Sequence, residues 1–401
     1  MSRSKRALGS LALALFAAGC GSRTGLAHDR PDAGARDAGT RDAGARDAGR
    51  DAATPLACPE PTGIGFTIAA HARHPIEGWS AQAPSAAGDG ERALLALEVE
   101  RGDLPRVALF ALDLRGTPRE LRELGNARAP ELGAGEAELA LATLDVTSAV
   151  IEVRGVGYDG ADRWSARITA AGDARFTRLA RPAFDGAGWV VAYAEADGVT
   201  VGTAGPAGFA AWRRLGGYAA ALAADPDRRQ SYLVVRTAPD AARLFRFDEL
   251  GTVIGPADGV ALPPIELPDA PAIAVERASG VLGALVLGSF LFDDVGLRVV
   301  LQRVRDDGTP TSGFSGPVGG MPSDVDLASH PALGGYGLYA SATGRADFHG
   351  ATRAFVGDLR SVTGASPQTV AIAPGPCGYF VLGVEHGDPP QLVTALAVPR
   401  R

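Results

Sequence analysis

The chain has 401 residues, of which 46% are hydrophobic, 21% charged and 6% aromatic, and its formal net charge is −7. That hydrophobic share is ample for a packed core, which excludes a chain that is disordered throughout. Residues 58–401 carry 30 basic and 40 acidic side chains. Because phosphate binding needs positive potential, this acidity argues against nucleic acid or an anionic lipid surface as a partner of that region.

Residues 1–19 have the pattern of a secretory signal peptide. Three basic residues among the first six precede the apolar run Ala7–Ala18, and small residues then lead to Cys20. The run is too short to span a bilayer as a helix. We therefore expect this segment to be removed on export.

Residues 20–57 form a degenerate repeat in which Asp-Ala-Gly recurs four times with Arg interleaved. Between residues 21 and 57, six Asp and six Arg cancel in charge. There is almost nothing to bury, so the segment cannot offset the entropy cost of ordering. We predict a disordered spacer with a root-mean-square reach of about 35 Å.

The residues Ala17-Ala18-Gly19-Cys20 resemble the lipobox of bacterial lipoproteins, although that family favours Leu where this chain has Ala17. Similar Asp-Ala-Gly tracts follow the lipid-carrying Cys in secreted lipoproteins of some high-GC Gram-negative bacteria. The resemblance implies palmitate on Cys20 as a membrane anchor. Gly21 and Ser22 differ from the Asp of inner-membrane retention, which implies outer-membrane sorting, on the periplasmic or the surface face.

The other two cysteines, Cys58 and Cys377, bracket almost the whole remaining chain. In an oxidising compartment such a pair can persist as a disulfide. Closing so long a loop would stabilise the fold by about 5 kcal/mol in the chain-entropy picture. We predict this disulfide, and two buried free thiols are the alternative.

From Gly63 onward, short apolar runs of strand length alternate with clusters of Gly, Pro and Asp, and Pro118–Leu124 is the best short helical candidate. Dense strands with regular turns predict an all-β sandwich or barrel-like architecture. The clearest strand candidates are Ala93–Val99, Val107–Leu112, Trp189–Tyr193, Tyr232–Val235, Ile273–Val275, Leu282–Leu287, Leu297–Val304 and Val393–Val398.

Two patterns recur in residues 58–401. One is a Pro beside a small residue at the start of a run, as in Pro182-Ala183. The other is an apolar strand that runs into a Gly turn at Gly116, Gly251 and Gly308, with Gly172 and Gly364 in comparable places, which gives intervals of 56 or 57 residues. The segment Asp225–Arg228, before the apolar run Tyr232–Val235, looks like the turn between the inner two strands of a propeller blade.

These units resemble β-propeller blades, which are four-stranded sheets of about 40–50 residues. Counting turns gives six units and leaves the strands Tyr379–Val384 and Leu392–Val398 without a fourth partner. The N-terminal strand Gly65–Ala69 could close the ring, which makes seven blades, with six as the alternative count. Closure would bring Cys58 near Cys377. A pair of β-sandwiches is the alternative fold.

Two motifs suggest sites that their surroundings do not support. Gly155–Gly160 matches G-x-G-x-x-G, but no helix or βαβ unit follows, so we expect a hairpin loop. His71 and His74 have the spacing H-x-x-H, but Pro75 disfavours a helix, so we expect exposed loop histidines.

Acidic residues and tryptophans leave two further possibilities open. Asp324 and Asp326, near His330, are weak candidates for metal ligands, although Asp in turns is common without metal. The four tryptophans at positions 79, 164, 189 and 212 could line a sugar-binding face or pack within blades.

With no nucleophile motif and no catalytic set, we predict a non-enzymatic envelope-anchored lipoprotein without a cofactor. It would act as a binding or scaffold module for a protein or a glycan, through one face or the central channel. One alternative is a propeller-type metal-dependent hydrolase or lactonase with Asp324, Asp326 and His330 in the channel. The other is a purely structural envelope protein, which would have no saturable ligand.

Overall fold

A computed structural model describes residues 66–76, 84–100, 103–173, 176–262, 272–276, 284–293, 296–305, 309–317, 325–331, 336–340, 345–349, 354–358, 369–385 and 389–399. The signal segment, the spacer, Cys20, Cys58, Asp324, Trp79 and Gly364 lie outside these residues. Within the described part, no helix is long and apolar enough to cross a membrane.

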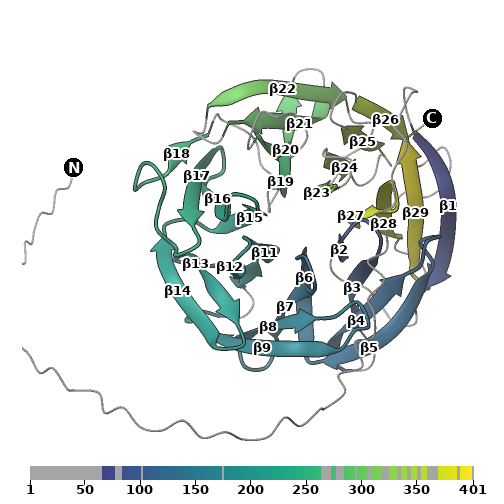
Figure 1. The fold of residues 1–401 in the computed structure, drawn as a ribbon, viewed down its shortest axis with the longest axis horizontal. Coiled ribbons are helices and arrows are strands. Elements are labelled where there is room, and N and C mark those ends of the chain that lie inside the picture. Colours follow the sequence, from purple (N-terminus) through teal and green to yellow (C-terminus); the bar gives the residue numbers. More distant parts are fainter. Residues whose placement is uncertain are drawn as a thin grey trace, which may run out of the picture. The chain divides into compact units, whose positions relative to one another are not determined.

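The described residues form seven antiparallel sheets arranged around a central axis (Figure 1). Each sheet is a blade, and in the first six blades the first strand along the chain lies nearest the axis and the last strand lies at the rim. This arrangement confirms the predicted all-β propeller with seven blades.

In blades 1, 2 and 4 each strand pairs with the next one along the chain, and in blade 3 the first two strands both pair with the third. Blade 1 contains β2 (Ser85–Gly88), β3 (Ala93–Glu100), β4 (Pro105–Leu112) and β5 (Pro118–Gly125). Blade 2 contains β6 (Ala127–Ala134), β7 (Leu139–Asp145), β8 (Val150–Val156) and β9 (Asp162–Thr169). Blade 3 contains β10 (Arg178–Leu179), β11 (Ala183–Phe184), β12 (Trp189–Glu195), β13 (Gly198–Gly205) and β14 (Gly208–Leu215). Blade 4 contains β15 (Ala219–Asp225), β16 (Gln230–Ala238), β17 (Ala241–Asp248) and β18 (Val260–Ala261).

Blades 5 and 6 repeat the pattern, and blade 7 joins the two ends of the folded region. Blade 5 contains β19 (Ala272–Glu276), β20 (Ala284–Asp293), β21 (Gly296–Val304) and β22 (Pro310–Pro317). Blade 6 contains β23 (Val325–Ser329), β24 (Tyr336–Ala340), β25 (Arg345–His349) and β26 (Ala354–Asp358). Blade 7 contains β27 (Thr369–Gly375), β28 (Gly378–Glu385), β29 (Gln391–Pro399) and β1 (Phe66–Pro75).

The ring closes through β1, which pairs antiparallel with β29 from Phe66↔Pro399 to Pro75↔Gln391. Closure by the N-terminal strand is therefore confirmed. The sequence predicts that two C-terminal strands lack a partner. Blade 7 in fact takes three strands from the C-terminal end, because β27 also belongs to it. The prediction of loop histidines is wrong, since His71 and His74 both lie in β1.

The helical candidate Pro118–Leu124 is wrong, because this segment is the outer strand β5. In its pairing with β4, Arg122 opposes Leu109 and Glu120 opposes Phe110, so Leu121 is an extra, bulged residue. A bulge reverses the alternation of side chains, so Leu121 and Leu124, three positions apart, both pack against the core cluster shared by blades 1 and 2. The sequence therefore shows the spacing of a helix. Outer strands β9, β14, β22 and β1 also carry one register shift each.

The strand-to-Gly pattern marks the turn between the third and fourth strands. In blade 1 the Asp113 carboxylate accepts hydrogen bonds from the backbone N–H groups of Arg115 at 2.8 Å and Thr117 at 2.7 Å. In blade 4 the Asp248 carboxylate accepts from Leu250 at 3.0 Å and Thr252 at 2.7 Å. The two turns are thus built alike.

The placement of Gly172 in this pattern is wrong, because Gly172 follows the outer strand of blade 2. The corresponding glycine is Gly160, in the turn between β8 and β9, where its N–H bonds to the Gly157 carbonyl at 2.8 Å. The 56-residue interval from Gly116 to Gly172 therefore does not describe the blades, whereas the 57-residue interval from Gly251 to Gly308 joins equivalent places in the strand order of blades 4 and 5. Gly155–Gly160 is a hairpin loop and its preceding strand residues, as expected.

The inner strands are built from small residues. Blade 4 begins with Ala219-Ala220-Ala221-Leu222-Ala223, all buried. Seven strands converge at the axis, where each has less room than at the rim, and alanine fits that space without displacing a neighbour. Larger apolar side chains fill the space between blades, as Leu233, Phe245 and Phe247 do beside blade 3.

Candidate functional site in the central cavity

A cavity of about 430 Å³ opens at the centre of the ring. It lies at the level of the inner strands, and every blade contributes to its wall. Representative lining residues, one from each of the seven inner strands in order, are Ala87, Ala134, Ala183, Ala224, Ala274, Ala328 and Pro374.

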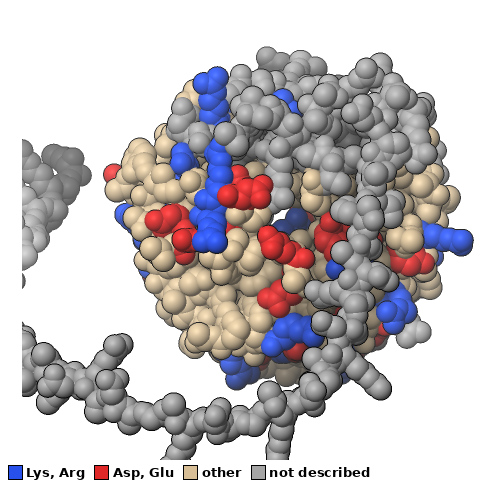
Figure 2. Space-filling view, in the orientation of Figure 1, with Lys and Arg blue, Asp and Glu red and all other residues tan. Residues whose placement is uncertain are grey.

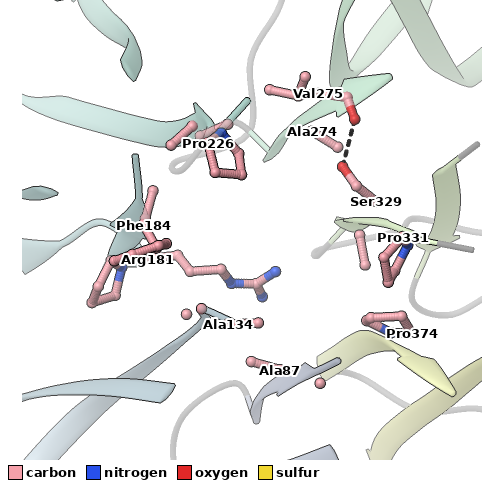
Figure 3. Close-up of a pocket in the computed structure, with 18 of the residues that line it drawn as sticks. Ala87, Ala134, Arg181, Phe184, Pro226, Ala274, Val275, Ser329, Pro331 and Pro374 are labelled. Carbon is pink, nitrogen blue, oxygen red and sulfur yellow. Dashed lines mark hydrogen bonds between the residues drawn. The ribbon is translucent and has the colours of Figure 1, made fainter. Parts of the chain in front are cut away.

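The wall is mostly methyl groups, backbone and proline rings. Figure 3 shows Pro226, Pro331 and Pro374 around the opening, with Phe184 on one side. The Ser329 hydroxyl donates a hydrogen bond to the Val275 carbonyl at 2.6 Å, which joins blade 6 to blade 5. The described lining side chains are therefore mostly apolar, while backbone groups and a few polar side chains make a comparable share of the exposed surface polar.

Arg181 is the exception, because its long side chain extends into this space (Figure 3). It lies where the inner strand of blade 3 is interrupted, between β10 and β11. Its guanidinium reaches the other side of the ring, where Nη2 donates to Asp326 Oδ2 at 2.8 Å and Nη1 to the Leu327 carbonyl at 3.2 Å. About a quarter of the side chain, 26%, is exposed.

Asp326 is held from three sides. Besides Arg181, the backbone N–H of Ile372 donates to Oδ2 at 3.0 Å, and the N–H of Leu327 donates to Oδ1 at 2.8 Å. Its side chain is 15% exposed. This carboxylate thus links blades 3, 6 and 7.

Acidic side chains surround the entrance. Asp89, Glu136 and Asp227 line it from the turns after the inner strands of blades 1, 2 and 4. Figure 2 shows acidic side chains gathered near the centre of this view. Burial acts to raise the pKa of Asp89, but hydrogen bonds from Arg92 and Glu91 outweigh it and the pKa lies below its ordinary value.

His330, a weak metal candidate, does not face a ligand. It is 1% exposed, its Nε2 lies 2.9 Å from the Gly375 carbonyl oxygen, and its ring meets Tyr379 edge to face. Burial lowers its pKa, although hydrogen bonding to Gly375 and Gly378 acts in the other direction. Among the described residues, no group of three His, Cys, Asp or Glu side chains is placed to hold a metal.

The described tryptophans pack within and between blades. Glu138 Oε1 accepts the indole N–H of Trp164 at 2.7 Å and that of Trp189 at 3.1 Å, which ties blade 2 to blade 3. Trp212 packs against Phe247 with ring centroids 5.9 Å apart. These contacts favour packing over a sugar-binding face for the three residues.

The remaining sequence motifs lie away from the cavity. Cys377, in the turn between β27 and β28, is in a disulfide whose partner is outside the described residues, so the pairing with Cys58 stays a prediction. Successive strand residues point to opposite faces, so the odd spacing of His71 and His74 in β1 does not direct both at one metal. Sequence reasoning missed Arg181, although it placed the next two residues, Pro182 and Ala183, at a blade opening.

No protein-family model and no curated protein matches the chain. Among solved structures, the WD40 domain of coronin from Toxoplasma gondii is similar with a TM-score of 0.54 at 12% identity, over 84% of this chain and 89% of that one. A chain of a mitotic checkpoint complex gives 0.50 at 9% identity, over 86% and 98%. A putative 6-phosphogluconolactonase from Bacteroides uniformis gives 0.45 at 15% identity, over 69% and 85%. The first two likenesses show the propeller fold alone.

Proposed function

We propose that this chain is a non-enzymatic lipoprotein of a bacterial envelope, anchored through Cys20, whose propeller binds part of a ligand in its central cavity. The cavity carries the proposal. Its volume of about 430 Å³ falls within the range of small-molecule sites, and mostly apolar lining side chains with a few charged ones are typical of such sites. The sequence of residues 1–57 supports the anchor and the spacer.

The metal-dependent hydrolase is less well supported by the same geometry. A metal ligand needs a lone pair directed at the ion, but the oxygens of Asp326 accept from Arg181, Ile372 and Leu327. The Nε2 of His330 is engaged with Gly375, between blades. A non-catalytic binding role asks nothing more of these two residues than the structural contacts that they make.

The test uses the Cys20→Ala chain, which keeps the propeller and lacks the proposed lipid. Binding to fractionated envelope proteins and glycans is measured with this protein, with Ala134→Trp and with Ala210→Trp. Ala134 is exposed in the cavity, and Ala210 is exposed on the outer strand β14, so a Trp fills the cavity only in the first variant.

We expect saturable binding that Ala134→Trp abolishes and Ala210→Trp leaves unchanged. Binding that is unaffected by both variants would refute the cavity as the site. No saturable binding would favour the purely structural envelope protein. Stoichiometric calcium or zinc in the purified protein, measured by elemental analysis, would favour the hydrolase.

A further inference from the structure

We infer that the central cavity binds the carboxylate end of a small aliphatic chain, with Arg181 as the residue that recognises the carboxylate. The inference rests on the proposed function and names the class of ligand. Three features of the cavity lead to it: its apolar wall, its guanidinium and its acidic entrance.

The lining side chains fit an aliphatic chain better than a sugar. Each hydroxyl that leaves water without a hydrogen-bond partner weakens binding, and most side chains of the inner wall are methyl groups and proline rings, which offer none. The Ser329 hydroxyl already donates to the Val275 carbonyl. An aliphatic chain loses nothing in such surroundings and gains by removing its own surface from water. The inner wall therefore fits methylene or methyl groups.

Arg181 supplies the polar end of the cavity. A guanidinium presents five N–H donors in a planar fork, and carboxylates are the groups that this fork recognises best. The side chain is 26% exposed, and Figure 3 shows its guanidinium within the space that the wall encloses. Because low-dielectric walls strengthen a charge-assisted hydrogen bond, a carboxylate that reaches this group binds more strongly than at the outer surface.

Asp326 would compete with the ligand for Arg181. Its ion pair with Nη2, at 2.8 Å, offsets much of the positive charge of the guanidinium. The N–H groups of Ile372 and Leu327 would still hold Asp326 if the guanidinium turned partly toward a ligand. Removing the charge of Asp326 should therefore tighten binding, whereas removing the charge of Arg181 should weaken it.

The entrance limits the charge of the ligand. Asp89, Glu136 and Asp227 place negative charge where a ligand enters, and Arg92 pairs with Asp89 at 2.8 Å. These carboxylates repel an anion that enters, and they repel a dianion about twice as strongly as a monoanion. We therefore expect a single carboxylate to enter and inorganic phosphate to be excluded.

The experiment measures the affinity of the Cys20→Ala protein for defined probes by calorimetric titration. Hexanoate and hexan-1-ol have the same chain and differ in charge. Trialanine with a free or an amidated C-terminus separates a peptide end from a fatty acid, and glucuronate represents a sugar acid. The variants are Arg181→Gln, Arg181→Lys and Asp326→Asn, each checked for cooperative thermal unfolding.

We expect saturable hexanoate binding that Arg181→Gln weakens at least tenfold, with hexan-1-ol bound equally by both proteins. Asp326→Asn should tighten hexanoate about threefold or more, and Arg181→Lys should keep part of the affinity. If the ion pair served packing alone, the two neutralising variants would change affinity in the same direction. If trialanine binds with a free but not with an amidated C-terminus, the ligand is a peptide end. If hexanoate binds and trialanine does not, the ligand is an alkanoate.

Hexanoate that does not bind, or that binds the Arg181→Gln protein as well as the parent, overturns the inference. Stronger binding of glucuronate than of hexanoate overturns it in favour of a glycan. The proposed function fails separately, because it depends on whether Ala134→Trp blocks the envelope ligand. A cavity-dependent envelope ligand together with no carboxylate binding would leave that proposal standing and remove this one.

Discussion

Two glycines lie in equivalent turns, and replacing each by alanine separates two contributions to the loss of stability. One is the strain of a left-handed backbone, and the other is steric overlap of the new Cβ with its neighbours. Gly116 in blade 1 has φ of 75° and Gly251 in blade 4 has φ of 79°. Each N–H bonds to the carbonyl of the Asp three residues earlier, at 2.9 Å from Asp113 and 3.0 Å from Asp248. Alanine in the left-handed region costs roughly 1–2 kcal/mol, and this cost should be the same at both sites.

The surroundings of the two glycines differ. A Cβ at position 116 would lie 3.7 Å from Phe380 Cδ1 and Thr394 Oγ1, which is ordinary contact. A Cβ at position 251 would lie 2.6 Å from Trp212 Cδ1 and would overlap its Cγ. Overpacking of this kind costs about 1–3 kcal/mol. We expect Gly116→Ala to lower the free energy of unfolding by about 1–2 kcal/mol and Gly251→Ala by about 2–5 kcal/mol.

The assay is urea unfolding of the Cys20→Ala protein followed by circular dichroism, with equal m-values as a condition for comparison. Adding Trp212→Ala closes a double-mutant cycle that removes the overlapping ring. In that background the cost of Gly251→Ala should fall to that of Gly116→Ala. Equal losses in the two single variants would refute the steric part of this reasoning.

Three further predictions concern a buried carboxyl group, the anchor and the disulfide. Burial raises the pKa of Glu98 despite the hydrogen bond from Ala129 N–H at 2.8 Å, so the folded state binds the proton more tightly than the unfolded chain does. The free energy of unfolding should therefore fall as pH rises from about 4.5 through the raised pKa. Glu98→Gln should remove this fall in urea titrations at stepped pH, and an unchanged pH profile would contradict the prediction. Cys20→Ala should move the protein from the membrane pellet to the soluble fraction, and protein that stays in the pellet would disprove lipid anchoring there. Cys377→Ser should lower the free energy of unfolding by up to about 5 kcal/mol under oxidising conditions, and Cys58→Ser should give the same loss. Neither variant should change stability in the presence of a reductant. Unequal losses would show that the two cysteines are not partners.

The fold was predictable because its signals are local. Short apolar runs mark strands, and turns such as Asp113–Thr117 repeat their hydrogen bonds from one blade to another. Ring closure followed from counting strands that lacked a partner. The interval from Gly116 to Gly172 is wrong because the turn between the third and fourth strands of blade 2 holds Gly160, and the sequence has a glycine in both places. The bulge at Leu121 made a strand look helical for a reason that is visible only once its pairing with β4 is known.

The candidate site was not predictable from the sequence, because it depends on contacts between residues far apart along the chain. Arg181 and Asp326 are separated by 145 positions. The chain has 38 arginines, and nothing in the residue type marks Arg181 as the one that lies in the cavity. The carboxylate of Asp326 was selected as a metal candidate on its acidity, and only the convergence of blades 3, 6 and 7 shows that it pairs with a cation.

The position of Arg181 follows from a local break in an inner strand. Pro182 lacks an N–H and cannot continue the ladder, while the Ala180 N–H still bonds to Ala192 O at 3.0 Å, so the chain between β10 and β11 leaves the sheet for these residues. Gly133 in blade 2 makes room for the break, because a Cβ there would overlap the Pro182 carbonyl. A side chain on a regular inner strand would have to fit the space that alanine occupies in the other blades. The interruption allows a long side chain to extend along the cavity instead, so Pro182 and Gly133 set the place where a charge can lie at the centre of this ring.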